Sequence, residues 1–387
     1  MKLQTESLKK EMIAWRHDFH KYPELGFQEV RTSKLIAELL RSFGLKVYEK
    51  VGKTGVVGHL ERNKAKKLIA IRADIDALPI EEKTSLSYQS QRNGTMHACG
   101  HDGHTATLLG AAKYLSQDKS FDGNILFIFQ PDEENGGGAK AMIEDNLFKK
   151  FSVSEVYALH NMPGMPVGYF ATRENTITAS ESSFEIEVIS KGGHSALPNM
   201  GGNAIQIASQ IVNSLQTIVS RKIDPRKNAV LSITEFITNG KKNILASKVV
   251  LKGDTRCLDD DTKAIIESEL RRICQSITAA SDASCVVKFE TNFPITYNSK
   301  APTQNLTKCV IDTFGKKNIE SNCAPMLFSE DFSFMARQVP GCFVLIGNGS
   351  NGPNAEPLHS PKFDFNDEIL TLGSCLWVNL AKMISKH

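Results

Sequence analysis

The sequence predicts an α/β protein in which a mostly parallel sheet is flanked by helices and a second, ferredoxin-like (βαββαβ) domain is inserted. Apolar strand-like runs alternate with helical segments over about the first 180 residues and again after the insertion, and this alternation is typical of parallel sheets. The run that begins at Leu68 is continuously apolar at its start, as expected of a strand covered on both faces. We therefore expect one domain from residues 1–180 and 296–387, and an inserted domain from residues 181–295.

The elements of the first domain follow from apolar periodicity and turn residues. In chain order we expect helices at 6–20 and 28–43, strands at 47–48, 55–60 and 68–76, a helix at 105–115, a strand at 124–129, a helix at 136–147 and a strand at 155–159. Ligands of parallel sheets gather beyond the carboxyl ends of the strands. Asp74, Glu133, Glu134 and His160 fall at such ends, so we expect them to lie in one site.

The inserted domain begins with a strand at 183–190, where Phe184, Ile186 and Val188 alternate with glutamates as in a half-buried strand. We then expect a helix at 203–219, strands at 229–237 and 248–256, a helix at 260–279 and a strand at 285–291. The order β-α-β-β-α-β is that of a split βαβ unit. After the insertion, the pattern predicts a helix at 302–314, a strand at 342–346 and a last helix at 366–384.

Composition excludes several classes of protein. The 387 residues include 46 basic and 43 acidic side chains, a net charge of +3, and no basic run is interleaved with aromatic residues, so a nucleic-acid partner is not expected. No apolar stretch reaches the roughly 20 residues that span a bilayer, so we expect no membrane association. Residues 1–6 show no export signal, and the eight cysteines form no CxxC pair. We therefore expect reduced thiols and a cytoplasmic location.

Residues 96–105 carry much of the predicted chemistry. His97, Cys99, His101, Asp102 and His104 place three imidazoles, one thiol and one carboxylate within eight positions, and these are the donors of a transition-metal site. The alternative is a polar loop in which Asp102 only caps a helix that starts near residue 105. The metal site is favoured because carboxylate and imidazole groups recur in the motifs at 130–134, 158–161 and 357–360, each of which we expect at or just beyond the end of a strand.

Five side chains in these motifs can bind metal. They are Cys99, His101, Glu134, His160 and His359. Five ligands are too many for one tetrahedral ion with an open position and suit two ions about 3.5–4 Å apart. The Cys99 thiolate favours zinc, with manganese, cobalt or nickel as alternatives. Glu133, next to a ligand, can act as the general base on a metal-activated water. We expect His97 and His104 to support the ligands, and we disfavour a reaction in which Cys99 is the nucleophile.

Ordered motifs run along nearly the whole chain. They are Arg16–His20 with Pro23–Gly26, Ala73–Pro79, His97–His104, Gln130–Glu134, His160–Asn161, Gly193–Ala196, Gly253 with Arg256, Ser329–Phe332 and Leu358–His359. With these motifs the chain resembles the M20 family of metallopeptidases and amidohydrolases, in its subgroup of N-acyl-amino-acid hydrolases. That subgroup includes hippurate hydrolases, N-acetyldiaminopimelate deacetylases and plant auxin-conjugate hydrolases.

The resemblance implies roles for the residues that match the family motifs. The five candidate ligands would hold a dinuclear metal centre, Glu133 would be the general base, and Asp74 would support the site. In the inserted domain, His194 would act in catalysis, and Asn243 and Arg256 would bind the substrate carboxylate or polarise the scissile carbonyl. The first domain would then be catalytic, and the insertion would be a lid through which the chain forms a homodimer. In relatives, the partner subunit often supplies the histidine.

Some positions depart from the subgroup pattern. Asn199 and Asn203 stand where the subgroup usually has His and Asp, and Asn243–Ala246 lacks the usual proline. Asp132 stands where the family often has Ala. None of these changes removes a ligand or the base, so they bear on which substrate is preferred.

These features together predict a metal-dependent enzyme that hydrolyses the amide bond of an N-acyl amino acid. The alternative is a dipeptidase or carboxypeptidase that uses the same metal centre on a small peptide. A substrate with a free amino terminus would need an acidic anchor, and the sequence indicates none. A metal-bearing binding protein is disfavoured because the base and all five ligands are present.

Overall fold

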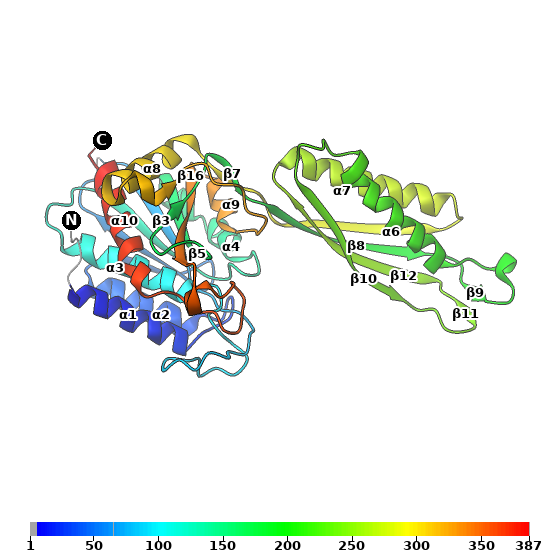
Figure 1. Cartoon of the computed structure of the whole chain (residues 1–387), viewed down its shortest axis with the longest axis horizontal. Coiled ribbons are helices and arrows are strands. Elements are labelled where there is room, and N and C mark those ends of the chain that lie inside the picture. Colours follow the sequence, from blue (N-terminus) through cyan, green and yellow to red (C-terminus); the bar gives the residue numbers. More distant parts are fainter. Residues whose placement is uncertain (1–5, 65, 387) are drawn as a thin grey trace. The chain divides into compact units, whose positions relative to one another are not determined.

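A computed structural model describes residues 6–64 and 66–386, which form two compact units. Unit 1 comprises Met1–Ile177, Thr296–Ala324 and Glu330–His387, and unit 2 comprises Thr178–Ile295 and Pro325–Ser329 (Figure 1). Residues 1–5, on which the expectation of no export signal partly rests, lie outside the described residues. None of the helices in the described part of the chain has the length and apolar character needed to cross a membrane.

Unit 1 is built around an eight-stranded sheet with the strand order β1-β2-β4-β3-β5-β16-β6-β15. The strands are β1 (Lys46–Val51), β2 (Gly55–Glu61), β3 (Leu68–Asp74), β4 (Asn124–Gln130), β5 (Val153–Pro163), β6 (Phe170–Ala171), β15 (Ile319–Glu320) and β16 (Gly341–Gly349). The central strands β4, β3, β5 and β16 are parallel to one another, whereas β1 and β2 are antiparallel additions at one edge. The predicted mostly parallel sheet is confirmed. The short pair β7 (Asn175–Thr178) and β14 (Thr296–Asn298) follows separately.

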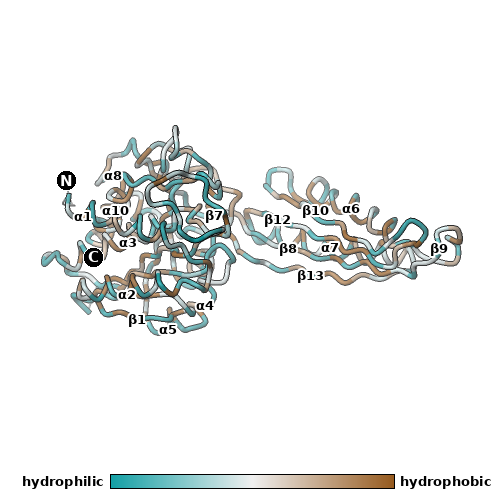
Figure 2. Tube along the Cα trace, turned by 90° about the horizontal axis from the view of Figure 1, so that it is seen from below, coloured by the Kyte–Doolittle hydropathy of each residue, from teal (hydrophilic) through white to brown (hydrophobic). Residues whose placement is uncertain are grey.

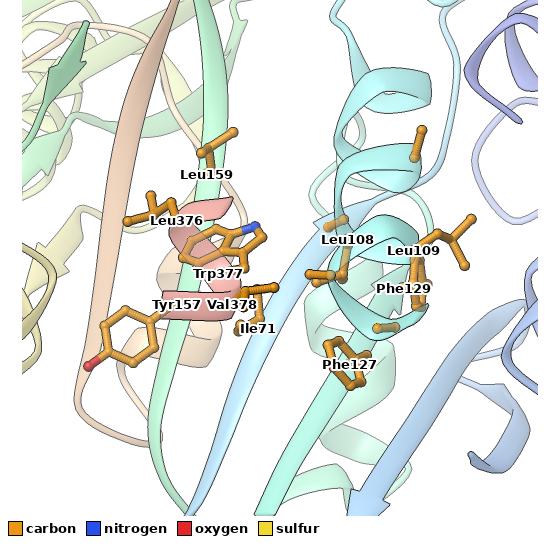
Figure 3. Packing of buried hydrophobic residues seen from close by; sticks show 14 of the residues in the cluster. Ile71, Leu108, Leu109, Phe127, Phe129, Tyr157, Leu159, Leu376, Trp377 and Val378 are labelled. Atoms are coloured by element: carbon orange, nitrogen blue, oxygen red, sulfur yellow. The ribbon is translucent and has the colours of Figure 1, made fainter. Parts of the chain in front are cut away.

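Helices complete the core of unit 1. They are α1 (Glu6–Lys21), α2 (Val30–Ser42), α3 (His101–Gln117), α4 (Gly138–Glu144), α5 (Leu147–Lys150), α8 (Lys300–Phe314), α9 (Phe332–Ala336) and α10 (Glu368–Ile384). Alternate residues of each strand point to one face, so Ile71, Phe127 and Tyr157 join a single buried cluster with Leu108 of α3 and Trp377 of α10 (Figure 3). This packing fixes α3 against the sheet, close to the carboxyl ends of the strands.

Four local predictions were wrong. Helix α3 begins at His101 rather than near residue 105, because Gly100 adopts a left-handed φ of 96° in a place where a Cβ atom would overlap the Asn161 side chain. Strand β3 ends at Asp74 rather than at residue 76. The helix expected over 136–147 is interrupted at Asn146, which has a φ of 66°. His359 does not follow a strand: it lies in a turn well beyond β16.

Unit 2 has the predicted β-α-β-β-α-β order. Its elements are β8 (Ser180–Ile189), α6 (Ala204–Arg221), β10 (Ala229–Thr238), β12 (Lys248–Cys257), α7 (Asp260–Ala279) and β13 (Ser284–Phe293) (Figure 2). The strands form an antiparallel sheet in the order β10-β12-β8-β13, and apolar residues such as Ile186 of β8, Ile211 of α6 and Leu270 of α7 form its core. A two-residue pair, β9 (Gly193–His194) and β11 (Ile244–Leu245), stands apart from this sheet.

The core of unit 1 gives a test of the fold. Phe127 is fully buried, so Phe127→Ala should lower the free energy of unfolding by about 3–5 kcal/mol. The control Val30→Ala, at a position that is 69% exposed, should change it by less than about 0.5 kcal/mol. Urea unfolding followed by tryptophan fluorescence measures both, because Trp15 and Trp377 both belong to unit 1. Equal effects of the two changes would contradict the assignment of Phe127 to the core.

Candidate metal centre

Unit 1 brings the five predicted metal donors into overlapping groups. Cys99 and His101 lie where the loop enters α3, Glu134 follows β4, His160 lies within β5, and His359 lies in its turn. One group joins Cys99, His101 and His160, and another joins Cys99, Glu134 and His359; in each, the ligand atoms lie within 4.8 Å of one another. Because the groups share the Cys99 sulfur, the five donors form one continuous cluster.

Several distances describe this cluster. The Cys99 Sγ atom lies 3.4 Å from His160 Nε2, and His359 Nε2 lies 3.3 Å from Glu134 Oε1. His101 Nε2 lies 3.8 Å from the same Glu134 oxygen. Soft sulfur and imidazole donors together with a carboxylate are the set that zinc and neighbouring transition metals prefer.

The hydrogen bonds around the cluster leave donor atoms available to a cation. His101 Nδ1 donates to the Asp76 carbonyl oxygen at 2.9 Å, and His160 Nδ1 donates to the Asn161 carbonyl oxygen at 2.7 Å. Since a carbonyl can only accept, Nε2 is the nitrogen with a lone pair in both rings. His101 Nε2 and Glu134 Oε1 are buried and have no hydrogen-bond partner within the described chain. Such orphaned acceptors are costly without a ligand, so the residues fit a divalent metal.

Two aspartates after β3 hold the donors in place. Asp76 accepts from His101 Nδ1 and, through Oδ2, from the backbone amide of Glu134 at 3.0 Å. Asp74 Oδ1 lies 2.6 Å from His104 Nδ1. The other nitrogen of His104 accepts from the Asn161 amide at 3.1 Å. Both ring nitrogens of His104 are therefore engaged by protein groups, as the expectation of a supporting role requires. His97 is also buried, but neither of its ring nitrogens has a hydrogen-bond partner within the described residues.

Glu133 follows β4, directly before Glu134, and lies among buried acids. Its Oε1 accepts from the Asp331 amide at 3.3 Å, and Glu133, Glu330 and Asp331 form a buried group of carboxylates. Burial, followed by the charges of Glu330 and Glu134, raises the pKa of Glu133 well above its ordinary value. Burial likewise raises the pKa of Asp331 to about 8.

Arg72 supplies the positive charge within this acidic group. Its guanidinium is fully buried and donates to Asp74 at 2.7 Å, to Gln130 at 2.8 Å and to Asp331 at 2.9 Å. It therefore joins the ends of β3 and β4 to the segment that carries Asp331. Arg72, Asp76 and Asp331 were given no role by sequence reasoning, although all three lie within or beside the quoted motifs at 73–79 and 329–332.

Burial and neighbouring charges shift the pKa values of two candidate ligands, Glu134 and Cys99. Burial opposes ionisation of Glu134, but the neighbouring His359, His101 and Cys99 together outweigh it, so the Glu134 pKa lies below its ordinary value. Burial and the charge of Glu134 raise the pKa of the Cys99 thiol well above its ordinary value. A reactive nucleophilic cysteine requires the opposite shift. Burial therefore disfavours a free thiolate nucleophile at Cys99, and ligation would require a metal ion to stabilise the thiolate.

Three residues of unit 2 were predicted to take part in the site, and only His194 and Asn243 lie close together. His194 is exposed in β9, where it pairs with Ile244, and the Asn243 carbonyl accepts from the Ser195 amide at 3.2 Å. Arg256 lies at the far end of β12. Strand β12 pairs with β8 from Lys248 to Cys257, so roughly 27 Å of strand separates its start from Arg256. The Arg256 guanidinium is held by Glu181 at 2.6 Å and by Asp254 at 3.0 Å, and it donates to Ser329 at 2.8 Å.

Several known proteins are similar to this chain in sequence and in fold. The chain is 41% identical to a hippurate hydrolase of Campylobacter jejuni, covering 95% of this chain and 94% of that protein. It is 39% identical to thermostable carboxypeptidase 1 of Saccharolobus solfataricus, covering 97% and 95%. The crystal structure of the Bacillus subtilis protein YXEP, described as a dinuclear metal binding peptidase from the M20 family, matches with a TM-score of 0.85 and 32% identity over 99% of each chain.

A family model gives the same result over most of the sequence. Residues 70–383 match the model for peptidase family M20/M25/M40, and this range contains every candidate ligand, the candidate base and the whole of unit 2. The resemblance seen in the motifs is thereby confirmed. The chain belongs to the M20 peptidase family.

Proposed function

We propose that this chain is a metal-dependent amidohydrolase that cleaves the amide bond of N-acyl amino acids, with acetyl, benzoyl or similar acyl groups. One observation carries the proposal: a buried carboxylate, Glu133, stands next in sequence to Glu134 of a five-donor cluster. Membership in a family of hydrolases and 41% identity to a hippurate hydrolase support it. Hippurate is itself an N-acyl amino acid.

Two divalent ions held by the donor cluster would supply Lewis-acid polarisation of the amide carbonyl and would lower the pKa of a water molecule. Zinc suits the thiolate best, with manganese, cobalt or nickel as alternatives. Glu133 takes a proton from the attacking water and gives it to the leaving amine. A carboxylate with a raised pKa suits both transfers, because it binds the proton firmly enough to hold it between them.

The neighbours of Glu133 orient it for these transfers. The Asp331 amide donates to one carboxylate oxygen, which limits rotation of the group. Arg72 balances the charge of Asp331 and Asp74, so that a further carboxylate can be tolerated nearby. Burial of Glu133 keeps bulk water away from the proton that it carries.

The alternative is a dipeptidase or carboxypeptidase that uses the same centre. Its support is the 39% identity to a carboxypeptidase. A carboxypeptidase cleaves the amide before a terminal amino acid, so its substrate differs from an N-acyl amino acid only in the acyl part. A dipeptidase would also need an acid to bind the free amine, and the buried aspartates described above are already paired with Arg72, His101 or His104.

Unit 2 is proposed to recognise the substrate and to form a homodimer. His194 would stabilise the oxyanion, and Asn243 and Arg256 would bind the substrate carboxylate. The exposure of His194 on a short strand pair suits a group that acts on a molecule outside its own unit. Exposed apolar side chains of the same unit, among them Phe236 and Ile237 of β10, would be covered in a dimer.

Metal removal tests the reaction class. The chain should hydrolyse N-benzoyl- and N-acetyl-amino acids faster than dipeptides, and a chelator should abolish this activity until zinc, manganese, cobalt or nickel is restored. Metal analysis should give up to two ions per chain, and Cys99→Ala should lose at least one. Cys257→Ala, at a buried thiol of unit 2, is the matched control and should keep both. Full activity in metal-free protein would reject the mechanism.

Replacement of each of the two adjacent glutamates in its own variant tests their separate roles. Glu133→Gln should leave the metal content near normal and lower kcat by about 10²–10⁴-fold, the usual contribution of a general base. Glu134→Gln should lose metal and lose activity in proportion. Metal analysis and steady-state kinetics on both variants measure this. The reverse pattern would exchange the two assignments.

Mixed dimers test whether subunits share a site. His194→Ala and Glu133→Gln should each be nearly inactive, because removal of one oxyanion donor costs about 10²–10³ in kcat. After joint denaturation and refolding, the mixture should recover activity, since a hybrid dimer would contain one intact site. Each variant refolded alone is the control. A verified hybrid dimer without recovered activity, or an active monomer, would show that His194 does not act across subunits.

A further inference from the structure

A buried arginine outside the donor cluster joins two segments that carry candidate ligands. Arg16 lies in α1 and has no exposed surface. Its Nε donates to Asp102 Oδ2 at 2.8 Å, and its Nη2 forms an ion pair with Asp364. Asp102 directly follows His101, and Asp364 lies five residues after His359. One guanidinium thus connects the start of α3 with the segment after the His359 turn.

Further contacts close this arrangement into a network. Asp102 Oδ2 also lies 2.9 Å from His20 Nδ1, and the other nitrogen of His20 lies 3.3 Å from Glu82. The Tyr88 hydroxyl donates to Asp364 Oδ2 at 2.9 Å, and the Arg16 guanidinium lies over the Tyr88 ring. The planar group is therefore fixed by hydrogen bonds at its edge and by a ring at its face, a geometry that lysine cannot reproduce.

The His359 turn is held by the residues that flank it: Phe363 and Phe365 are buried in the core of unit 1, and Asn348 Nδ2 donates to the Asp364 carbonyl at 3.1 Å. The His359 side chain is 52% exposed, whereas the other four candidate ligands are buried or nearly so. The His359 amide donates to the Ala98 carbonyl at 2.8 Å, and the Lys83 amide donates to the Pro361 carbonyl at 2.7 Å. His359 itself has a φ of 65°, an unfavourable value for a residue with a side chain. Such a turn needs support from the structure around it.

The contact between the turn and α3 is close. A Cβ atom at Gly103, in the first turn of α3, would overlap the Phe365 ring. The segment that carries Asp364 and Phe365 therefore rests directly on the helix that begins with His101. The ion pairs of Arg16 with Asp102 and Asp364 bridge the same two segments.

We propose that Arg16 is a positioning residue for the metal centre, which sets the affinity for the ion bound by Cys99, Glu134 and His359. The inference rests on the proposed function, because it takes these side chains to be ligands. Arg16 acts through Asp364 on the turn and through Asp102 on α3, and touches none of the ligands in the contacts described. If its role were only structural, its loss would lower the stability of unit 1 without acting selectively on one ion.

Cobalt titration of the metal-stripped, full-length protein tests the inference. Co²⁺ reports each binding step by its visible absorption. Asp364→Ala should weaken one of two Co²⁺ ions by about 10–100-fold, the usual effect of losing a group that orients a ligand. The weakened step should be the same one that His359→Ala removes. Asp364→Asn keeps an acceptor for Arg16, so it should restore most of the affinity.

Two further variants complete the design. Arg16→Lys keeps the charge but loses the two-sided geometry, so it should weaken the same step. Because Arg16 also neutralises buried Asp102, its loss can unfold the chain, and the Asp364 variants then decide the question. Arg31→Met is the matched control: Arg31 pairs with Asp18 at 2.8 Å on a half-exposed surface away from the turn, and should leave both steps unchanged.

The outcomes separate the inference from the proposed function. If folded Asp364→Ala binds both ions with normal affinity, or if both steps weaken equally as the melting temperature falls, the positioning role is rejected while the reaction class stands. If the unaltered protein binds no Co²⁺ and retains activity, the proposed metal chemistry fails first. Selective weakening of the His359 step, with rescue by Asp364→Asn, supports the role of Arg16.

Discussion

The burial of carboxylates around the strand ends, the first turn of α3 and the start of α9 is the constraint on which unit 1 depends. Asp74, Asp102, Glu133 and Asp331 are all removed from water, and an ionised carboxylate is stable there only when it is paired and hydrogen-bonded. Two fully buried arginines provide the pairing: Arg72 serves the acids around the base, and Arg16 serves those beneath α3. An unpaired buried charge is costly, so these ion pairs restrict the positions of the segments they join. The same segments carry or adjoin the donor side chains, whose positions are therefore restricted as well.

The sheet explains why the segments meet at this edge. Strands β3, β4 and β5 are parallel neighbours, so the residues at and after their carboxyl ends lie side by side although they are distant in sequence. Asp74 pairs in register with Gln130, and the donors Glu134 and His160 follow from the neighbouring strands. The helix α3 enters the same edge with its first turn, which places His101 opposite Glu134. Three of the donors, Cys99, Glu134 and His359, lie in loops or turns rather than in helices or strands, and His359 has a φ of 65°.

The contrast between regular strands and irregular turns explains which parts of the site could be predicted from the sequence. Donors at strand ends were found because apolar runs reveal the strands, and parallel order then reveals the shared edge. The Arg16 network could not be found in this way: Arg16 and Asp364 are 348 positions apart. Arg16 does share the buried face of α1 with Met12 and Phe19, but this spacing does not reveal its partners. The start of α3 was missed because Gly100 resembles an ordinary loop glycine until its contact with Asn161 is known. The family resemblance supplied roles that local patterns could not, including those of His194, Asn243 and Arg256.

The two units carry different kinds of residue, and this division bears on substrate preference. The candidate base and four of the five candidate ligands lie buried or nearly so in unit 1, within networks that tolerate little change. In unit 2, His194 is exposed on a two-residue strand, and Asn199 lies in an exposed short helix near it. The departures at Asn199, Asn203 and Asn243–Ala246 all fall in unit 2. Asn199 is exposed, whereas Asn203 caps α6 and Ala246 is buried in the core of unit 2, so these positions differ in their cost to folding. Asp132 is the exception, since it adjoins Glu133 with a φ of 47° and its side chain accepts from Asn135 at 2.6 Å. Its amide donates to buried Glu29, so Asp132 is fixed in place beside the candidate base.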